Sequence, residues 1–359
     1  MSLRVLHVNN QRTWRGGERQ VELLVGYSSD RVHSAIACDP TGTLYQRLSK
    51  YHEVVDLSIR HGFDLKAAFR LKKFARKYDL IHCHTPKAQS VAVLAKLLGC
   101  KIPVVCTKRT SFPIGKNYFS KLKYRRTDRI VCVSQASAEL LQKQLPDLTL
   151  KVIHSAIEKA QKIKPVDLEA LIPETRNRKI IGYVAAFTEE KNPQVFLKTA
   201  TSVIDQNDDC CFLWIGDGPL KTNIQTQVEK LGLSDRIFLP GFQKDIQSWI
   251  AALDVLFFPS SSEGFPTTVL QALQVSVPVV ASSLPGIREM ITQGETGLLE
   301  EANHPDGFAN KILEILSNDD LSRFMRDNGL QSVKQYYADQ MAEKYIRLYQ
   351  EMLGSTNSQ

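Results

Sequence analysis

The sequence lacks the features that mark membrane-spanning, secreted and disordered proteins. No stretch approaches the roughly 18–20 consecutive apolar residues that a membrane-spanning helix needs. Residues 1–8 lead straight into a strand-like run, without a basic segment followed by a long apolar one. With 43% hydrophobic and 23% charged residues, the 359-residue chain has an ordinary globular composition. We therefore expect a cytoplasmic protein of about two domains, at roughly 150 residues each.

Cysteine pairs are lacking as well. None of the seven cysteines belongs to a Cys-x-x-Cys motif, and several lie in apolar runs, such as Cys132 within residues 130–133. An odd number of thiols in apolar surroundings predicts buried, reduced cysteines and neither a disulfide framework nor a structural zinc site.

The fingerprints of common nucleotide-binding and nucleic-acid-binding folds are also missing. The chain contains neither Gly-x-Gly-x-x-Gly nor Gly-x-x-x-x-Gly-Lys-Ser/Thr, so dinucleotide binding and a P-loop are not supported. It has no helix-turn-helix, zinc-finger or RNA-recognition signature, and we expect no nucleic-acid partner.

What the sequence does have is an uneven distribution of charge. The net charge is +8, but residues 1–155 hold 27 Lys and Arg against 11 Asp and Glu, a charge of +16. The remaining residues hold 19 against 27, a charge of −8. This asymmetry indicates that the first half faces something anionic: nucleic acid, a membrane surface or a phosphorylated substrate.

Two segments of the first half concentrate the basic residues. Residues 70–77 are typical of a solvated helix face. Residues 108–126 interleave basic with aromatic side chains, a mixture that suits lipid headgroups. We expect this second segment to form an acceptor or membrane side made of Lys108, Arg109, Lys121, Lys123, Arg125 and Arg126.

Short apolar runs alternate with helix-length amphipathic segments along the whole chain. The runs are mostly Val, Ile, Leu, Phe and Cys with little polar alternation, which is typical of parallel strands buried on both faces. Repeated strand–helix order predicts an α/β protein. The expected strands are residues 4–8, 80–82, 104–106, 130–133, 152–154, 180–184, 211–215, 237–239, 255–258 and 277–281.

The strands fall into two sets, separated by a polar segment with prolines at residues 156–178. We interpret this segment as a linker between a domain of residues 1–155 and a second domain that begins at residue 179. Ligands of open α/β sheets bind at the carboxyl ends of the strands. We therefore expect the site in a deep cleft between the two domains.

Two motifs of the first domain follow expected strands. The turn Arg15-Gly16-Gly17-Glu18-Arg19 opens a helix, where glycines allow backbone N–H groups to approach an anion closely. A plain tight turn is the alternative. His84 lies just after the expected strand 80–82, where the chain leaves for a loop. A structural buried histidine is its alternative, although the strand end favours a functional role.

The second domain offers three motifs of the same kind. Lys191 lies where the chain leaves residues 180–184 and could meet a phosphate, with a solvated lysine as the alternative. Gly216 and Gly218 form a turn after residues 211–215. Glu263 and Gly264 follow residues 255–258 and precede a helix start, where free N–H groups and a carboxylate could hold phosphate beside sugar hydroxyls; the helix start carries Thr267 and Thr268.

In their order along the chain, these motifs resemble the family 4 glycosyltransferases, retaining enzymes of the GT-B fold that use nucleotide-sugar donors. The resemblance covers nearly the whole chain, through residues 284–289 and 294–299 to residues 337–353. It implies two Rossmann-like domains, residues 1–155 and 179–338, and a terminal helix within residues 339–359 that crosses back to the first domain.

The resemblance also implies roles for the motif residues. Glu263 would contact sugar hydroxyls, His84 would lie near the transferred sugar and Lys191 would hold the diphosphate; these three form the expected catalytic set. No metal or other cofactor is expected, and Asp-x-Asp is absent. The expected donor-binding residues are Gly16, Gly17, Gly216, Gly218, Gly264, Phe265, Thr267, Thr268 and Gln271.

Two positions depart from the family pattern. The family's second glutamate is Gln271 here, and the arginine that often precedes the lysine by five positions is Ala186. An amide loses charge-assisted strength, and a missing cation weakens diphosphate binding unless another, such as Arg288, replaces it. We therefore predict weaker donor binding than in a member with both groups.

These observations favour a peripheral enzyme at the inner face of the plasma membrane. It would move a sugar from a nucleotide-sugar, UDP being the family's commonest carrier, to a lipid-linked or lipopolysaccharide-type glycan, and it would meet an anionic membrane surface. The alternative is a non-catalytic partner subunit with a decayed donor site. A third reading is another GT-B-like enzyme, such as a nucleotide-sugar epimerase.

Overall fold

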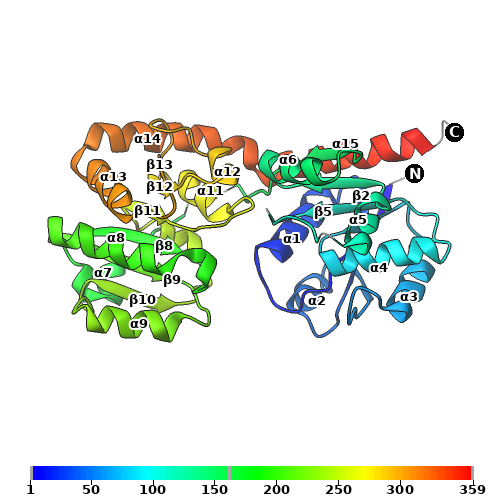
Figure 1. Cartoon of the computed structure of the whole chain (residues 1–359), viewed down its shortest axis with the longest axis horizontal. Helices are drawn as coiled ribbons and strands as arrows, with labels where there is room; N and C mark the ends of the chain where they lie inside the picture. The colour runs from blue at the N-terminus through cyan, green and yellow to red at the C-terminus, as the bar shows by residue number, and fades with distance from the viewer. Residues whose placement is uncertain (1–2, 111, 116, 160–162, 357–359) are drawn as a thin grey trace. The chain divides into compact units, whose positions relative to one another are not determined.

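The computed structural model describes residues 3–110, 112–115, 117–159 and 163–356, with side chains to residue 354. Residues 160–162 of the expected linker, residues 357–359 of the expected terminal segment and Lys116 of the second basic segment lie outside these ranges. The chain forms two compact units (Figure 1). Unit 1 comprises Met1–Glu158 and Tyr336–Gln359, and unit 2 comprises Lys159–Gln335.

Unit 1 is built on a parallel sheet of seven strands in the order β3-β2-β1-β4-β5-β6-β7. Val5 of β1 lies opposite Ser34 of β2 on one side and opposite Leu80 of β4 on the other, and the other strands of this sheet also pair in parallel. The strands are β1 (Leu3–Val8), β2 (Val32–Cys38), β3 (Glu53–Asp56), β4 (Leu80–Cys83), β5 (Val104–Lys108), β6 (Arg129–Cys132) and β7 (Leu150–Val152).

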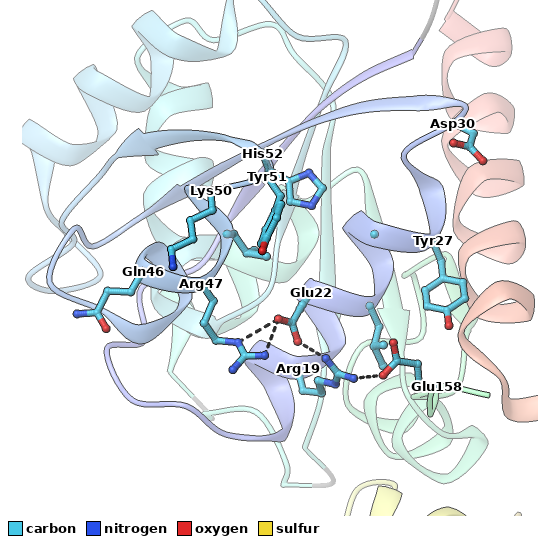
Figure 2. A pocket seen from close by; sticks show the side chains of 13 residues that line it. Arg19, Glu22, Tyr27, Asp30, Gln46, Arg47, Lys50, Tyr51, His52 and Glu158 are labelled. Carbon is cyan, nitrogen blue, oxygen red and sulfur yellow. Dashed lines mark hydrogen bonds and ion pairs between the residues drawn. The ribbon is translucent and has the colours of Figure 1, made fainter. Parts of the chain in front are cut away.

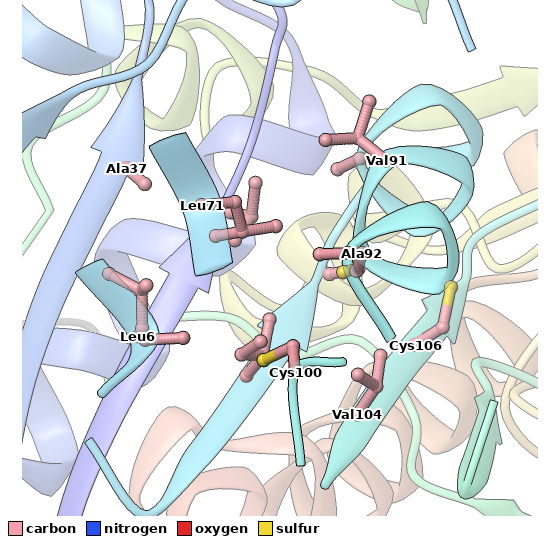
Figure 3. Close-up of a cluster of buried hydrophobic side chains, with 14 of the residues drawn as sticks. Leu6, Ala37, Leu71, Val91, Ala92, Cys100, Val104 and Cys106 are labelled. Carbon is pink, nitrogen blue, oxygen red and sulfur yellow. The ribbon is translucent and has the colours of Figure 1, made fainter. Parts of the chain in front are cut away.

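Helices cover both faces of this sheet because alternate strand residues are apolar on each side. One face packs on α3, α4, α5 and α6; Figure 3 shows Leu71 and Val91 of these helices against Leu6 and Val104 of the strands. The other face packs on α1 and α15, with α2 beside α1. The helices are α1 (Gly16–Ser28), α2 (Thr43–Leu48), α3 (Leu65–Ala75), α4 (Pro86–Leu97), α5 (Tyr118–Arg125), α6 (Gln135–Gln144) and α15 (Ala338–Thr356).

The last helix belongs to unit 1 although it follows unit 2 in the sequence. Ile157 pairs with Tyr337 in a parallel bridge: its N–H donates to the Tyr336 carbonyl (3.0 Å) and its carbonyl accepts from Ala338 (2.9 Å). From there α15 buries Tyr345 and Tyr349 against the sheet. Its residues thus reach the carboxyl half of the unit 1 strands.

Unit 2 has a six-stranded parallel sheet in the order β10-β9-β8-β11-β12-β13. Its strands are β8 (Lys179–Val184), β9 (Cys210–Ile215), β10 (Ile237–Gly241), β11 (Val255–Phe258), β12 (Val279–Ser282) and β13 (Leu298–Glu300). Its helices are α7 (Leu168–Leu171), η1 (Pro173–Thr175), η2 (Glu189–Lys191), α8 (Pro193–Gln206), α9 (Lys221–Lys230), α10 (Ile246–Ile250), α11 (Thr267–Gln274), α12 (Pro285–Arg288), α13 (Pro305–Ser317), α14 (Asp319–Ser332) and η3 (Val333–Tyr336), the last of which ends at the boundary with unit 1.

Aromatic packing fills one side of the unit 2 sheet. Trp214 of β9 stacks on Phe187 with ring centroids 4.5 Å apart and packs on Tyr183 and Phe196. All four side chains are fully buried. Each such ring contributes on the order of 2–3 kcal/mol of hydrophobic stabilisation. This cluster anchors the loops that leave β8 and β9.

Two sequence predictions are confirmed by this architecture. Both units are parallel α/β sheets of the Rossmann-like kind. All seven cysteines are buried and free, and burial raises the pKa of Cys106 to about 12, which keeps that thiol protonated. Within the described ranges, no helix is both long and apolar enough to cross a bilayer.

Candidate functional site

In unit 1 the expected site begins at the turn between β1 and α1. Glu18, 3% exposed, holds this turn: its Oε1 accepts from Asn9 Nδ2 (3.0 Å) and its Oε2 accepts from the Arg15 N–H (3.1 Å). A side chain at Gly16 would meet no atom within 4 Å, and one at Gly17 would make only ordinary contact with Arg109. Internal packing therefore does not require these glycines, which leave open space at the helix start.

His84 lies where β4 ends and α4 begins. Its N–H still pairs with the Val8 carbonyl of β1 (3.0 Å), while Thr85 caps α4 by accepting from the Ala88 N–H (3.2 Å) and Pro86 occupies the first helical position. A capped helix with proline at its start fixes the strand end firmly. The predicted position of His84 at a strand's carboxyl end is what the structure has.

A directional chain of hydrogen bonds controls the His84 ring. The Arg109 guanidinium, which can only donate, lies 3.3 Å from His84 Nδ1. The proton of a neutral His84 is therefore on Nε2, which lies 3.0 Å from His7 Nδ1, and His7 Nε2 then donates to Ser34 Oγ (3.3 Å). Arg109 thus fixes the tautomers of two histidines.

A third histidine completes this cluster. His82 Nδ1 lies 2.6 Å from the Tyr349 hydroxyl and its Nε2 lies 2.7 Å from Thr107 Oγ1, which also meets Tyr345. The His82 and His84 ring centroids are 4.0 Å apart. Helix α15 therefore supplies two hydroxyl groups to the site end of this sheet.

All three histidines are held neutral. Burial, with smaller contributions from neighbouring positive groups, lowers the pKa of His7 to about 3 and the pKa of His82 and His84 well below 6.5. An imidazolium would be desolvated here beside the Arg109 cation, which penalises it.

The cluster also has the composition of a metal site, since one nitrogen of each of His7, His82 and His84 lies within 4.8 Å of the others. Their ring nitrogens, however, already have protein partners, and the Arg109 cation contacts His84. A divalent ion would have to displace the hydroxyls or lie beside a guanidinium. These residues fit a hydrogen-bonded relay better than a metal site.

Two residues of the expected acceptor or membrane side lie elsewhere. Lys108 is 7% exposed and its ammonium donates to the Phe112 carbonyl (2.9 Å) and to the Thr110 carbonyl. Arg109 points to His84. Both belong to the end of β5 and its loop and point inward, so they do not fit the membrane part of the prediction; an acceptor role for them stays a prediction.

The other four residues of that set lie on or beside α5. Arg125 and Arg126 are exposed, and Arg125 pairs with Asp147 (2.8 Å). Lys121 and Lys123 are half-buried.

In unit 2 two of the three expected catalytic residues, Lys191 and Glu263, meet. Lys191 ends η2 after β8, and Glu263 follows β11; these strands are neighbours in the sheet, so their carboxyl ends lie side by side. The Lys191 ammonium forms an ion pair with Glu263, with side chains 17% and 12% exposed. The Ser261 N–H donates to the Glu190 carbonyl (2.9 Å), which joins the two loops.

The helix that follows Glu263 begins without a side-chain cap. Pro266 occupies the N-cap of α11 and offers no side-chain acceptor to the first N–H groups. Thr267 and Thr268 are half-buried on the first turn, and Phe265 is buried. An uncapped helix start is a ready anion site.

Close packing around this helix start explains why several positions there are glycine. A side chain at Gly286 would come within 2.2 Å of the Gly264 carbonyl oxygen, so α12 packs directly on the Glu263–Gly264 loop. A side chain at Gly216 would collide with the Ala185 carbonyl oxygen (2.0 Å), and one at Gly218 with Phe187 (2.6 Å). Gly216 and Gly218 are therefore required by a close contact between two loops, which Gly16 is not. Contact of these two glycines with the donor remains a prediction.

The departures from the family pattern lie on the same side of unit 2. Gln271 is half-buried on α11, Ala186 is exposed in the loop after β8, and Arg288 is exposed at the end of α12. An exposed Ala186 leaves room for the larger side chain that the family often carries.

A hollow beside α1 and α2 is not part of this site. It has a volume of about 720 Å³ and is lined by charged residues of α1 and the α2 region (Figure 2). Glu22 lies between Arg47 (2.9 Å) and Arg19, and Arg19 reaches Glu158. Its charges are neutralised among themselves, and none of the predicted site residues lines it.

Comparison with known proteins agrees with this architecture. Residues 14–161 match the model of Glycosyltransferase Family 4 and residues 170–332 that of Glycosyl transferases group 1. An uncharacterized glycosyltransferase of Methanocaldococcus jannaschii is 30% identical over 284 residues, 76% of each chain.

Two further likenesses concern function and fold. UDP-Gal:alpha-D-GlcNAc-diphosphoundecaprenol alpha-1,3-galactosyltransferase of Escherichia coli is 28% identical over 315 residues, 79% of each chain. The crystal structure of Anabaena HepE in complex with UDP-glucose superposes with a TM-score of 0.81 at 20% identity, covering 98% of this chain and 100% of that one. The fold is therefore GT-B, and the protein is a glycosyltransferase. It belongs to the family 4 glycosyltransferases.

Proposed function

We propose that the enzyme is a retaining glycosyltransferase that moves a sugar from a UDP-sugar to a lipid-linked glycan of the cell envelope. The observation that carries the proposal is the Lys191–Glu263 ion pair beside the uncapped start of α11. It puts a cation, a carboxylate and free backbone donors at one sheet edge.

Donor binding would exchange the partners of this pair. The donor diphosphate carries more charge than Glu263, so it competes for Lys191 and for the N–H groups of α11. Glu263, released from Lys191, then accepts hydrogen bonds from sugar hydroxyls. The two groups would hold one another until the donor arrives.

Unit 1 would supply a neutral polar surface to the transferred sugar. The resemblance to the family implies that His84 lies near that sugar, and the Arg109–His84–His7 chain holds its ring in one orientation. The space at Gly16 would let the α1 start approach donor or acceptor closely.

The transfer itself would proceed on one face of the sugar. The bond between the anomeric carbon and the diphosphate oxygen breaks, and the acceptor oxygen bonds to that carbon from the same side. The acceptor proton passes to the departing diphosphate, whose charge Lys191 and the α11 N–H groups stabilise. Configuration at the anomeric carbon is then retained.

The choice of UDP and of a lipid-linked acceptor is supported by the relatives. The Escherichia coli relative is named for UDP-Gal and for a sugar linked to diphosphoundecaprenol, and the Anabaena neighbour was crystallised with UDP-glucose.

The test is turnover of UDP-glucose, UDP-galactose and UDP-N-acetylglucosamine with a polyprenyl-diphosphate-linked sugar. We expect UDP release with one donor and a product of the donor's own anomeric configuration, read by NMR coupling constants. Inverted configuration would contradict the retaining mechanism, and no turnover with any UDP-sugar would contradict the donor class.

A second candidate is favoured by Gln271 and Ala186: a non-catalytic partner subunit whose donor site has decayed. It predicts no nucleotide-dependent rise in melting temperature with UDP, GDP, ADP or CMP. A ligand at 100 times its Kd adds about 2.7 kcal/mol of apparent stability, so binding would be visible.

A further inference from the structure

Three neighbouring helices of unit 1 contain basic residues and no acidic ones. Helix α4 lies between α3 and α5 (Figure 1). The sequences of these helices, LKAAFRLKKFA, PKAQSVAVLAKL and YFSKLKYR, contain nine Lys or Arg and no Asp or Glu. The basic segment at residues 70–77, which the sequence analysis assigned to a solvated helix, begins within α3 on this same face.

Several of these cations have no acidic partner. Among the described residues, ion pairs involve only Arg70, Lys96 and Arg125 of the nine, at the borders of the face. Lys66, Lys73 and Lys87 are exposed, and Lys121 is half-exposed. A surface of this kind attracts anions over a Debye length.

Large apolar side chains lie among these cations. Phe63, before α3, and Phe119, on α5, are 66% and 63% exposed, and their rings meet edge to face with centroids 5.8 Å apart. They border a groove of about 250 Å³ whose floor includes Val93 and Leu94 of α4. Phe69, Leu97 and Tyr118 are exposed on the same three helices.

We propose that the α3–α4–α5 face of unit 1 docks on an anionic lipid bilayer, with Phe63 and Phe119 inserted at the headgroup boundary. Aromatic rings flanked by lysines suit the interface between acyl chains and anionic headgroups. A nucleic acid would not require the aliphatic groove, and a protein partner would not require charge of a single sign. The inference rests on the proposed function for its purpose, which is to bring unit 1 to a lipid-linked acceptor.

Charge reversal tests the electrostatic part. The full chain is sedimented with vesicles of phosphatidylcholine alone and of phosphatidylcholine mixed with phosphatidylglycerol, at low salt and without donor or acceptor. We expect pelleting only with the anionic vesicles. Each lysine near such a surface strengthens binding about five-fold, so Lys66→Glu, Lys87→Glu and Lys121→Glu together should weaken it by at least about 100-fold.

The matched control reverses three exposed lysines of unit 2, Lys198, Lys230 and Lys244, to Glu and gives the same net charge. We expect this variant to retain binding within a few-fold. Equal loss in both variants would show a non-specific attraction to net charge and would overturn the docking face, as would a wild type that stays in the supernatant.

Insertion is tested by adding one tryptophan at a time and measuring the quenching in excess of that of the wild type, whose three tryptophans are the background. Phe119→Trp should be quenched by brominated lipids in anionic vesicles, whereas Phe242→Trp, at a comparably exposed position of unit 2 (69%), should not be. Absence of quenching at residue 119 would overturn insertion.

Nucleotide binding separates this inference from the proposed function. The shift in melting temperature caused by UDP reports on unit 2 and needs no vesicle. Loss of vesicle binding with a normal UDP shift overturns docking alone. Vesicle binding without a UDP shift leaves docking standing and removes the proposed function.

Discussion

The two units satisfy the polar groups at their strand ends in opposite ways. In unit 1 the histidines at 7, 82 and 84 are buried, neutral and bound to one another or to hydroxyls. In unit 2 Lys191 and Glu263 are charged partners that remain partly exposed. One arrangement is complete without a ligand, while the other is held by a pair that a stronger anion can separate.

The glycines of the two units also differ in how closely other atoms surround them. Gly216, Gly218 and Gly286 are required by close backbone contacts within unit 2, whereas Gly16 has open space where a side chain would be. In unit 2, rigid loops surround an ion pair that can separate, which suits a site whose charged groups change partners when a ligand binds. In unit 1, fixed neutral histidines lie in the same unit as the open turn at Gly16, which suits a site that positions a substrate.

The largest effect is expected from breaking the exchangeable pair. Lys191→Ala should lower the rate of sugar transfer by about 10²–10³-fold, because the cation that stabilises the leaving diphosphate is removed. Lys311→Ala is the matched control, since Lys311 of α13 forms a similar half-buried pair with Glu300 of β13, with side chains 24% and 12% exposed.

Transfer rates and urea unfolding of both variants distinguish the roles. Both should lose similar stability, on the order of 1–3 kcal/mol, because each removes the ammonium partner of a partly buried glutamate. Only Lys191→Ala should lose activity. Comparable activity in the two variants would assign Lys191 a structural role alone.

Acidification should weaken unit 1 through its histidines. Their pKa is lowered in the folded state, to about 3 for His7, so below about pH 6.5 the unfolded chain binds protons that the folded chain does not. Stability is full above that pH and falls as pH drops. From about pH 7 to about pH 5.5 each histidine should remove about 1 kcal/mol, roughly 3–4 in total.

Hydrogen exchange of β1 and β4 amides measures this loss within unit 1. His33→Gln, at an exposed position beside Glu53, is the control variant, because it leaves the three buried histidines in place. Opening free energies that stay constant across this pH range would contradict neutral, buried histidines.

The Arg109–His84 contact should affect activity through orientation. Arg109→Gln can place its carbonyl oxygen toward His84 Nδ1 and permits the other tautomer, so transfer should fall about ten-fold. The ¹⁵N shifts of the His84 ring should move with it, and Arg109→Lys should restore both in part. A rate loss without a change of tautomer would assign Arg109 another role.

The smallest expected effects are gains in UDP affinity at Ala186 and Gln271, the two positions that depart from the family pattern. Ala186→Arg adds a cation at an exposed position, and Gln271→Glu restores a charged acceptor on α11; each should tighten UDP binding by about 3–10-fold. Arg288→Ala should weaken it if Arg288 replaces the missing arginine. A wild-type Kd already below about 1 μM at physiological salt would contradict weakened donor binding.

The sequence predicts the core of both sheets because buried parallel strands are continuous apolar runs. It does not reveal β2 and β3, whose sequences VHSAIAC and EVVD mix polar with apolar residues, nor the short β13. The edge strands β3 and β13 are partly exposed, so their apolar pattern is weaker. Strand β2 is buried except at His33, and its apolar run is interrupted by His33 and Ser34.

The site residues divide similarly. Lys191 and Glu263 each follow an apolar run, and their meeting follows from the parallel order of β8 and β11. His7, Glu18 and the two tyrosines of α15 give no such signal, because they matter through contacts between segments far apart in the chain. Lys108 and Arg109 were misplaced because a basic cluster does not show which side chains turn inward.

The central claim is that a nucleotide diphosphate takes Lys191 from Glu263. Calorimetric UDP binding to the wild type, Lys191→Ala and Glu263→Gln tests it most directly. We predict that Lys191→Ala weakens UDP binding by about ten-fold or more, whereas Glu263→Gln, which frees Lys191, binds UDP at least as tightly as the wild type although it transfers sugar poorly. Equal weakening in both variants would contradict the exchange and would mean that the ion pair builds the site without being opened by the donor.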